Sequence, residues 1–273
     1  MELKFWGVRS SIPTPAPENL GCGGNTTGLE VRAPLGATLI IDGGTGARML
    51  GLDLLSRSSG GSVNLDILTT HFHWDHIQGI PFFAPLYKPK NPITFHTSKA
   101  ADEMRNIPEG QMTHPYFPVS FGLLGAQREF STLDQNSGPI AGGAFRVRPF
   151  ALNHPQGCSG YRIETEGGVI VHACDHEHGD PEADRRLLEM AQGADLLVYD
   201  LQFTPAEYDA KKGWGHSTWL EGTRVAKPAG VKRLLLTHHD PSHSDAFLEA
   251  MLLEARQEFP NTDLAKEGQA FAV

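Results

Sequence analysis

Three histidines and one aspartate lie within a stretch of six residues, at His71, His73, Asp75 and His76. The stretch closely follows the apolar pair Ile67-Leu68, which predicts a buried strand that ends at the cluster. Imidazole nitrogens and carboxylate oxygens are the ligands that zinc and other borderline cations prefer. Because alternate residues of an extended chain point in different directions, one such turn can supply ligands to two adjacent ions. The spacing therefore predicts metal-dependent chemistry at the end of this strand.

The segment Thr70–His76 resembles the metal-binding signature of the metallo-β-lactamase superfamily. This resemblance implies further ligands at the ends of later strands, and His154, Asp175 and His238 each follow an apolar, strand-like run. It also implies two divalent ions, with zinc as the expected metal and manganese as the alternative. By resemblance, the first ion takes His71, His73 and His154, the second takes Asp75, His76 and His238, and Asp175 bridges the two.

Two positions beside this ligand set are less determined by the sequence. His238 and His239 are adjacent, and the strand phase together with the Leu-Thr-His pattern favours His238 as the ligand. His239 is then expected to support the site or to face substrate. Asp42, in Ile41-Asp-Gly-Gly-Thr-Gly, matches the superfamily's first motif, where the aspartate supports the metal site from behind. The alternative for Asp42 is an ordinary turn aspartate before two glycines.

A second pair of motifs indicates a branch of the superfamily. Gly215-His216-Ser217-Thr218 resembles the His-Ser-Thr motif of the tRNA 3′-processing endonucleases and their cyclic-nucleotide phosphodiesterase relatives. Asp200 stands where that branch's His-Glu-Ala-Thr motif has glutamate, and its side chain is one methylene shorter. The resemblance implies that Asp200 orients His216, which contacts phosphate and protonates the leaving oxygen. The alternative is that His216 merely packs beside a helix capped by Ser217 or Thr218. Asp75, His216 and Asp200 are thus the expected catalytic residues.

These residues together predict a dinuclear phosphodiesterase that cleaves a cyclic or short nucleotide. Two ions lower the pKa of a shared water and clamp phosphoryl oxygens, so the expected nucleophile is a hydroxide that bridges the metals. The same metals could hydrolyse a thioester or a lactone, although Asp200 and His216 have no evident task there. Two further alternatives are an RNA 3′-processing nuclease and, less favoured, a non-hydrolytic di-iron redox protein.

Charge and spacing favour a small substrate over long nucleic acid. The chain has 23 Lys and Arg against 32 Asp and Glu, a net charge of −9, and an acidic surface tracks phosphate backbones poorly. The tRNA-processing enzymes carry a protruding arm between the ligands that correspond to His154 and Asp175, whereas here the intervening segment reads as two strands. The expected partner is therefore a small phosphodiester.

The elements that must position these residues form a recognisable order. Strand-like runs at 3–8, 28–31, 38–42 and 63–70 come first, and later strands at 144–151, 160–164, 169–173, 196–199 and 231–237 mix with helices. Helical patterns cover 46–57, 100–106, 183–192, 217–227 and 244–258. This order predicts sheets packed face to face with helices outside. With the resemblance, the expected fold is α+β, a four-layer αββα sandwich in a single domain over 1–273, with 81–143 as an elaborated loop that forms a lid or an interface.

The remaining expectations concern surroundings and partners. No run has the length of a signal peptide or of a transmembrane helix, which predicts a cytoplasmic protein without a membrane contact. The three cysteines are too scattered for a disulfide framework. Arg9 and Asn25 lie in loops after early strands and are candidate substrate contacts together with His239. The alternatives are a solvated arginine and a turn asparagine. The branch resemblance predicts a homodimer.

Overall fold

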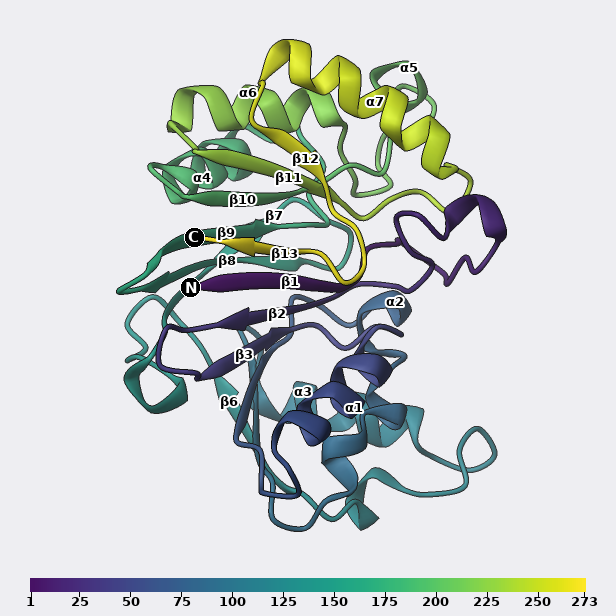
Figure 1. The fold of residues 1–273 in the computed structure, drawn as a ribbon, viewed down its shortest axis with the longest axis vertical. Helices are drawn as coiled ribbons and strands as arrows, with labels where there is room; N and C mark the ends of the chain where they lie inside the picture. The colour runs from purple at the N-terminus through teal and green to yellow at the C-terminus, as the bar shows by residue number, and fades with distance from the viewer.

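Seven strands form the first sheet of the computed structural model, which describes all 273 residues: β1 (Glu2–Gly7), β2 (Gly28–Arg32), β3 (Thr38–Ile41), β4 (Leu65–Leu68), β5 (Pro92–Thr97), β6 (Gln127–Thr132) and β13 (Ala270–Ala272). Their spatial order is β13-β1-β2-β3-β4-β5-β6. The pairs from β13 to β3 are antiparallel, and the pairs from β3 to β6 are parallel. Since β1 pairs with β13, the two chain termini lie side by side (Figure 1).

Six strands form the second sheet: β7 (Arg146–Leu152), β8 (Cys158–Thr165), β9 (Gly168–Ala173), β10 (Leu196–Asp200), β11 (Arg233–Thr237) and β12 (Thr262–Leu264). The pairs from β9 to β12 are parallel, whereas β8 is antiparallel to both β7 and β9. Strand β7 therefore runs in the same direction as β9, β10 and β11. The C-terminal ends of these four strands therefore lie at the same end of the sheet. This brings the residues that follow the strands close together.

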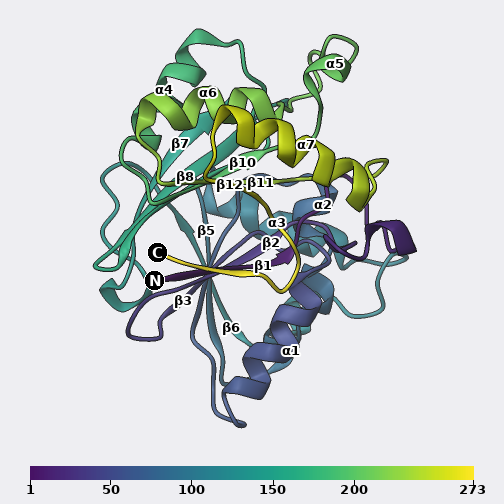
Figure 2. The ribbon, with the colours of Figure 1, turned by 45° about the horizontal axis from the view of Figure 1, so that its top comes forward.

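Seven α-helices flank the sheets: α1 (Ala47–Arg57), α2 (Trp74–Ile77), α3 (Ala101–Gln111), α4 (Pro181–Ala191), α5 (Pro205–Tyr208), α6 (Trp219–Ala229) and α7 (Asp245–Glu258). Five short 3-10 segments complete the elements: η1 (Pro17–Asn19), η2 (Ile80–Phe82), η3 (Ala84–Tyr87), η4 (Phe121–Leu123) and η5 (Ala141–Gly143). Helices α4, α6 and α7 lie together over the second sheet, and α1 lies on the opposite side of the molecule (Figure 2). No helix has the length and apolar character that crossing a bilayer requires.

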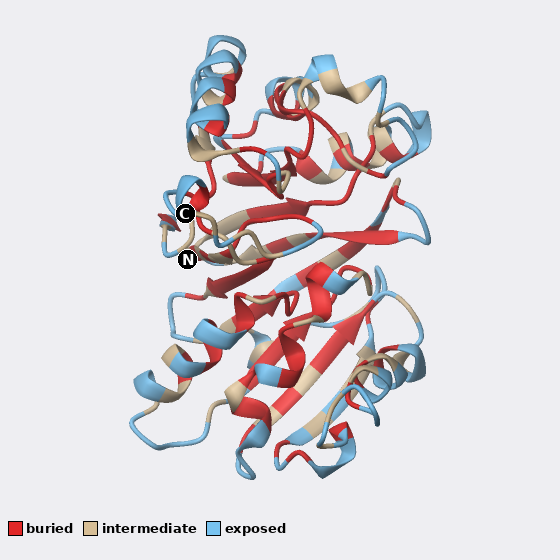
Figure 3. Cartoon of the chain, turned by 90° about the vertical axis from the view of Figure 1, so that its right-hand side faces the viewer, coloured by how far each residue is buried: buried red, intermediate tan, exposed pale blue.

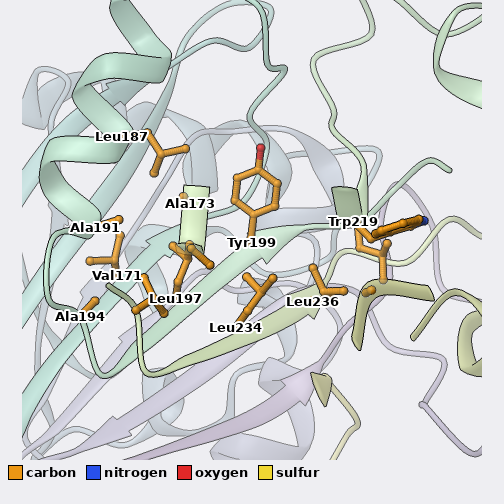
Figure 4. Packing of buried hydrophobic residues seen from close by; sticks show 14 of the residues in the cluster. Val171, Ala173, Leu187, Ala191, Ala194, Leu197, Tyr199, Trp219, Leu234 and Leu236 are labelled. Atoms are coloured by element: carbon orange, nitrogen blue, oxygen red, sulfur yellow. The ribbon is translucent and has the colours of Figure 1, made fainter. Parts of the chain in front are cut away.

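Three apolar layers hold the arrangement together. Residues between the sheets, such as Leu3, Phe5 and Val198, form the central layer. Leu187 of α4 packs with Leu197 in a second layer, under the helices of the second sheet (Figure 4). The third layer lies between α1, α3 and the outer face of the first sheet. Buried strands therefore run through the middle of the molecule, and the outer helix faces are exposed (Figure 3). Burying each large apolar side chain contributes on the order of 2 kcal/mol.

The expected four-layer αββα sandwich in one domain is confirmed. The main differences lie in 81–143, where the structure contains the strands β5 and β6 in addition to the expected loop, and where the helix expected at 100–106 is α3. The sequence did not predict β5 because it contains a proline, which cannot donate a hydrogen bond within a sheet. Pro92 is the first residue of the strand, where the missing N–H is tolerated. Strand β6 is the edge of its sheet, and its half-exposed polar sequence lacks the apolar pattern of an inner strand. A lid or interface role for the irregular remainder stays a prediction.

Candidate active site

Five strand ends meet at one point between the two sheets. The His71–His76 cluster follows β4, His154 follows β7, Asp175 follows β9, Asp200 ends β10 and His238 follows β11. Four groups have ligand atoms within 4.8 Å of one another: His71, His73 and His154; His71, His76 and Asp175; Asp75, His76 and His238; and Asp175, Asp200, His216 and His238. The structure thus brings all seven expected ligands together, from segments far apart in the chain.

Close pairs of ligand atoms lie at each of the two expected metal positions, and one group, His71 with His76 and Asp175, joins them. His154 Nε2 lies 3.1 Å from His73 Nδ1 at the first position, and His238 Nε2 lies 3.2 Å from Asp75 Oδ2 at the second. Asp175 reaches both, with Oδ1 at 3.8 Å from His154 Nε2 and Oδ2 at 3.6 Å from His238 Nε2. A carboxylate between two imidazole groups is placed to bridge two cations.

The unpaired atoms of this cluster fit a pair of bound cations. His71 Nε2 is buried and has no hydrogen-bond partner, and the buried His76 Nε2 and Asp175 Oδ2 lie 3.1 Å apart without a well-aligned hydrogen bond. Buried polar atoms are normally satisfied, so poorly paired nitrogen and oxygen atoms that converge on one point fit a bound cation. Nitrogen-rich sites with a few carboxylates suit zinc and related divalent ions.

The pKa shifts of the clustered residues also fit bound cations. Burial raises the pKa of the Asp175 carboxyl, but the imidazoles of His238 and His76 outweigh burial and hold this pKa well below its usual range. Burial lowers the pKa of His71 and of His154, which favours their neutral, ligating forms. Burial also lowers the pKa of His238, yet Asp175 and Asp200 outweigh it and raise the value to about 10. The carboxylates therefore stabilise positive charge here, which a proton or a cation can supply.

Three residues of the site have an unusual backbone conformation. Asp42, Asp175 and His238 have φ values of 61°, 59° and 65°, in the left-handed region that residues other than glycine rarely adopt. Such conformations cost about 1–3 kcal/mol each and persist where the surroundings hold them for function.

Asp42 lies behind the cluster, in the supporting position expected for it. Its Oδ2 accepts a hydrogen bond from His76 Nδ1 at 2.8 Å, and its Oδ1 accepts one from the backbone N–H of Thr70 at 2.8 Å. The Thr70 hydroxyl also donates to Asp42. Because a carboxylate only accepts, His76 must carry its proton on Nδ1, which leaves Nε2 free to face the cluster. Thr70 was not singled out in the sequence.

Asp200 and His216 form a hydrogen-bonded pair beside the ligand cluster, in contact with Asp175 and His238. His216 Nδ1 donates to Asp200 Oδ2 at 2.9 Å, so the shorter aspartate side chain spans the gap. Burial raises the pKa of Asp200, but His216 and His238 outweigh it and lower the pKa below its usual range. The His216 ring lies 5.2 Å from the rings of both His154 and His238 and is half-buried. Thr218 does cap α6, so the two readings of this motif are compatible.

His239 corrects the expectation of a substrate contact. The side chain is fully buried, and Nε2 donates to the carbonyl of Ala265 at 2.9 Å, away from the cluster. Burial lowers the pKa of His239 to about 3. Since neighbouring residues of a chain direct their side chains differently, His238 reaches the cluster and His239 packs into the protein.

Arg9 and Asn25 bind other segments of the chain, and the full burial of Arg9 contradicts the expected substrate contact for that residue. Arg9 is fully buried, and its guanidinium donates to the carbonyls of Gly23 at 2.8 Å and His243 at 2.7 Å. Asn25 Nδ2 donates to Glu267 Oε2 at 2.9 Å. Both residues join the N-terminal loop to segments near the other end of the chain, and these partners could not be identified from local sequence.

Glu177 is a residue of the site that sequence reasoning missed. Its carboxylate accepts the backbone N–H groups of Gly213 at 2.7 Å and Gly215 at 2.8 Å, and the hydroxyl of Tyr208 at 3.0 Å. The carbonyl of Gly215 in turn accepts from His154 Nδ1 at 2.8 Å. Burial raises the pKa of Glu177, but the two backbone donors and Tyr208 outweigh it and lower the pKa. Glu177 thus holds the loop that orients His154 and precedes His216.

Replacing Glu177 by glutamine should lower activity or metal affinity by about 10- to 100-fold, as expected when a partner of a ligand is lost. The amide nitrogen of glutamine cannot accept the hydrogen bond that the backbone N–H of Gly215 donates to Glu177, so the loop must shift away from His154. Steady-state kinetics and metal titration would measure the effect. Glu182→Gln, at an exposed position on α4, is the matched control. Wild-type kinetics and metal affinity in E177Q would contradict the assignment.

Comparison with known proteins agrees with this geometry. The family model described as "Beta-lactamase superfamily domain" matches residues 38–239. A ribonuclease Z of Brevibacillus brevis is 27% identical over 324 residues, covering 100% of this chain and 97% of the relative. The fold resembles the metallo-beta-lactamase fold protein YhfI from Bacillus subtilis (TM-score 0.74, 20% identity, 100% and 98% covered). It also resembles human tRNase Z, short form (TM-score 0.65, 20% identity, 100% and 99% covered).

The matched range includes the strand-end cluster and ends at His239, so fold, family and geometry refer to the same residues. The chain therefore belongs to the metallo-β-lactamase superfamily of hydrolases, and within it resembles the tRNA 3′-processing branch.

Proposed function

We propose that the protein is a metal-dependent phosphodiesterase. The observation that carries the proposal is the Asp200–His216 pair, hydrogen-bonded at 2.9 Å directly beside the ligand cluster. A phosphodiester needs a proton donor for its leaving oxygen, and His216 is placed to be that donor. The residues that would hold the ions are His71, His73 and His154 at one position, Asp75, His76 and His238 at the other, and Asp175 between them.

Two divalent ions bound there would supply an activated water and neutralise charge on the phosphoryl oxygens. Asp200 accepts the Nδ1 proton of His216, so Nε2 is the nitrogen that faces substrate and donates a proton to the leaving oxygen. Asp42 and Glu177 act through other residues, since they orient His76 and the His154-contacting loop. Zinc is the proposed metal because imidazoles dominate the set, with manganese as the alternative.

Two kinds of observation bear on the substrate class: the similarity to known proteins and the features of the chain itself. The ribonuclease Z relative aligns over its whole length, which supports an RNA 3′ region as substrate. An RNA 3′ region is therefore better supported as the substrate than the small nucleotide that charge and spacing favour. A cyclic or short nucleotide remains the second candidate because β8 and β9 occupy the segment between His154 and Asp175, and because the net charge is −9. The homodimer and the cytoplasmic location stay predictions.

Turnover of several ester classes by one metal-loaded preparation tests the proposal. We expect metal-dependent hydrolysis of bis(p-nitrophenyl) phosphate, abolished by chelation and restored by zinc or manganese. A short RNA with a 3′ trailer, 2′,3′-cyclic nucleotides and cyclic dinucleotides would then rank the two substrate classes. Lactone or thioester hydrolysis without phosphodiester cleavage would overturn the phosphodiesterase. Bound iron with a visible absorption band would support the redox alternative.

A further inference from the structure

We propose that Lys211 and Trp214 form a nucleotide-binding subsite beside His216, where the indole stacks on a base and the ammonium contacts phosphate. This inference rests on the proposed phosphodiesterase function and specifies its substrate class, a nucleoside phosphodiester instead of a simple alkyl one. RNA 3′ regions and short nucleotides share this chemistry.

A continuous row of side chains connects the subsite to the catalytic pair. Lys211 Nζ lies 4.2 Å from the centroid of the Trp214 ring and 5.9 Å from that of Phe203. The Phe203 ring lies 6.0 Å from the His216 ring in an edge-to-face arrangement. Phe203 is buried and contacts both residues, so its ring links Lys211 to His216.

The charge of Lys211 is available to an anion. Lys211 forms no ion pair, whereas Lys227 and Lys232 each pair with a carboxylate. Its ammonium rests over aromatic faces, which attract a cation only moderately and leave its N–H donors free. In a chain of net charge −9, an uncompensated ammonium that is separated from His216 by the Phe203 ring is suited to a phosphate oxygen.

Trp214 is presented on a loop whose position is fixed. Its side chain is 56% exposed, although the residues on both sides are anchored. The backbone N–H groups of Gly213 and Gly215 both donate to Glu177. An exposed indole on an anchored loop loses little conformational freedom when a base stacks on it. Aromatic side chains in nucleic-acid sites bind bases in this way without strong sequence preference.

Two substrates with the same leaving group isolate the contribution of the base. Thymidine 5′-(p-nitrophenyl phosphate) carries a base and methyl p-nitrophenyl phosphate does not. We expect Trp214→Ala to lower kcat/KM for the thymidine ester by about 5- to 100-fold, mainly through KM, and to change the methyl ester less than about twofold. Trp214→Phe should restore most of the loss. Tyr116→Ala, at an 82% exposed aromatic in another loop, is the matched control.

The lysine is tested with the same pair of esters. Lys211→Gln should raise KM for both, since both contain the phosphate, and should weaken the dependence of KM on salt. Lys90→Gln replaces another exposed lysine without an ion pair and should change neither ester.

Calorimetric binding of thymidine 5′-monophosphate to the metal-loaded protein tests the subsite independently of hydrolysis. Weaker binding to Trp214→Ala by the same factor would support the subsite. Equal effects of Trp214→Ala on both esters, or unchanged nucleotide binding, would overturn it while leaving the phosphodiesterase intact. Absence of phosphodiester turnover in the wild-type protein would instead reject the proposed function, and the binding experiment would still decide on the subsite.

Discussion

Replacing His216 by alanine should lower the turnover of phosphodiesters with poor leaving groups by about 100- to 10,000-fold, the range of a lost general acid. His216 Nδ1 is held by Asp200 at 2.9 Å, so Nε2 is available to donate a proton as the leaving oxygen departs. A p-nitrophenolate leaves without protonation and should be affected much less. The measurement compares kcat for dinucleotide and p-nitrophenyl esters on the same metal-loaded variants.

Two further variants make this result specific. Asp200→Asn should reproduce part of the loss, because an amide orients the imidazole less strongly than a carboxylate and cannot stabilise its charged form. His178→Ala is the matched control, since His178 is also half-buried nearby but bonds to Ser217 Oγ, at 2.8 Å. An equal loss for both leaving groups in H216A, together with reduced metal content, would assign His216 a structural role.

Replacing Asp175 by asparagine should reduce bound metal from two ions per chain to one or fewer and lower turnover by about 1000-fold. The two carboxylate oxygens of Asp175 face different imidazoles, with Oδ2 at 3.1 Å from His76 Nε2 and Oδ1 at 3.8 Å from His154 Nε2. An amide offers only one oxygen and turns its N–H₂ group toward the other position, where it cannot ligate a cation.

Metal content by elemental analysis and turnover on the same sample would measure this effect. Asp195→Asn is the matched control, because Asp195 pairs with Lys232 near the start of β10, at the opposite end of the strand from Asp200. Two tightly bound ions and wild-type turnover in D175N would contradict a bridging position for Asp175.

Much of the active site could be predicted from the sequence because it lies at strand ends. An apolar run followed by a histidine or an aspartate locates a strand and its last residue, as at Leu68 before the cluster and Thr237 before His238. Parallel strands whose two faces are covered have their C-terminal ends at the same end of the sheet. The order of ligands, the two-sheet architecture and the Asp200–His216 pair all follow from patterns of this local kind, read with the superfamily resemblance.

Only the tertiary structure decided the residues whose partners lie far away in the chain. Arg9 had the charge and the loop position of a substrate contact, yet it donates to the carbonyl of His243, 234 residues later, and is buried. Glu177 gave no sequence signal because its role lies in the backbone N–H groups of Gly213 and Gly215, which every non-proline residue possesses. Local patterns determine where a strand ends and which side chains it carries, whereas loop packing determines which of them meet substrate and which hold the loops in place.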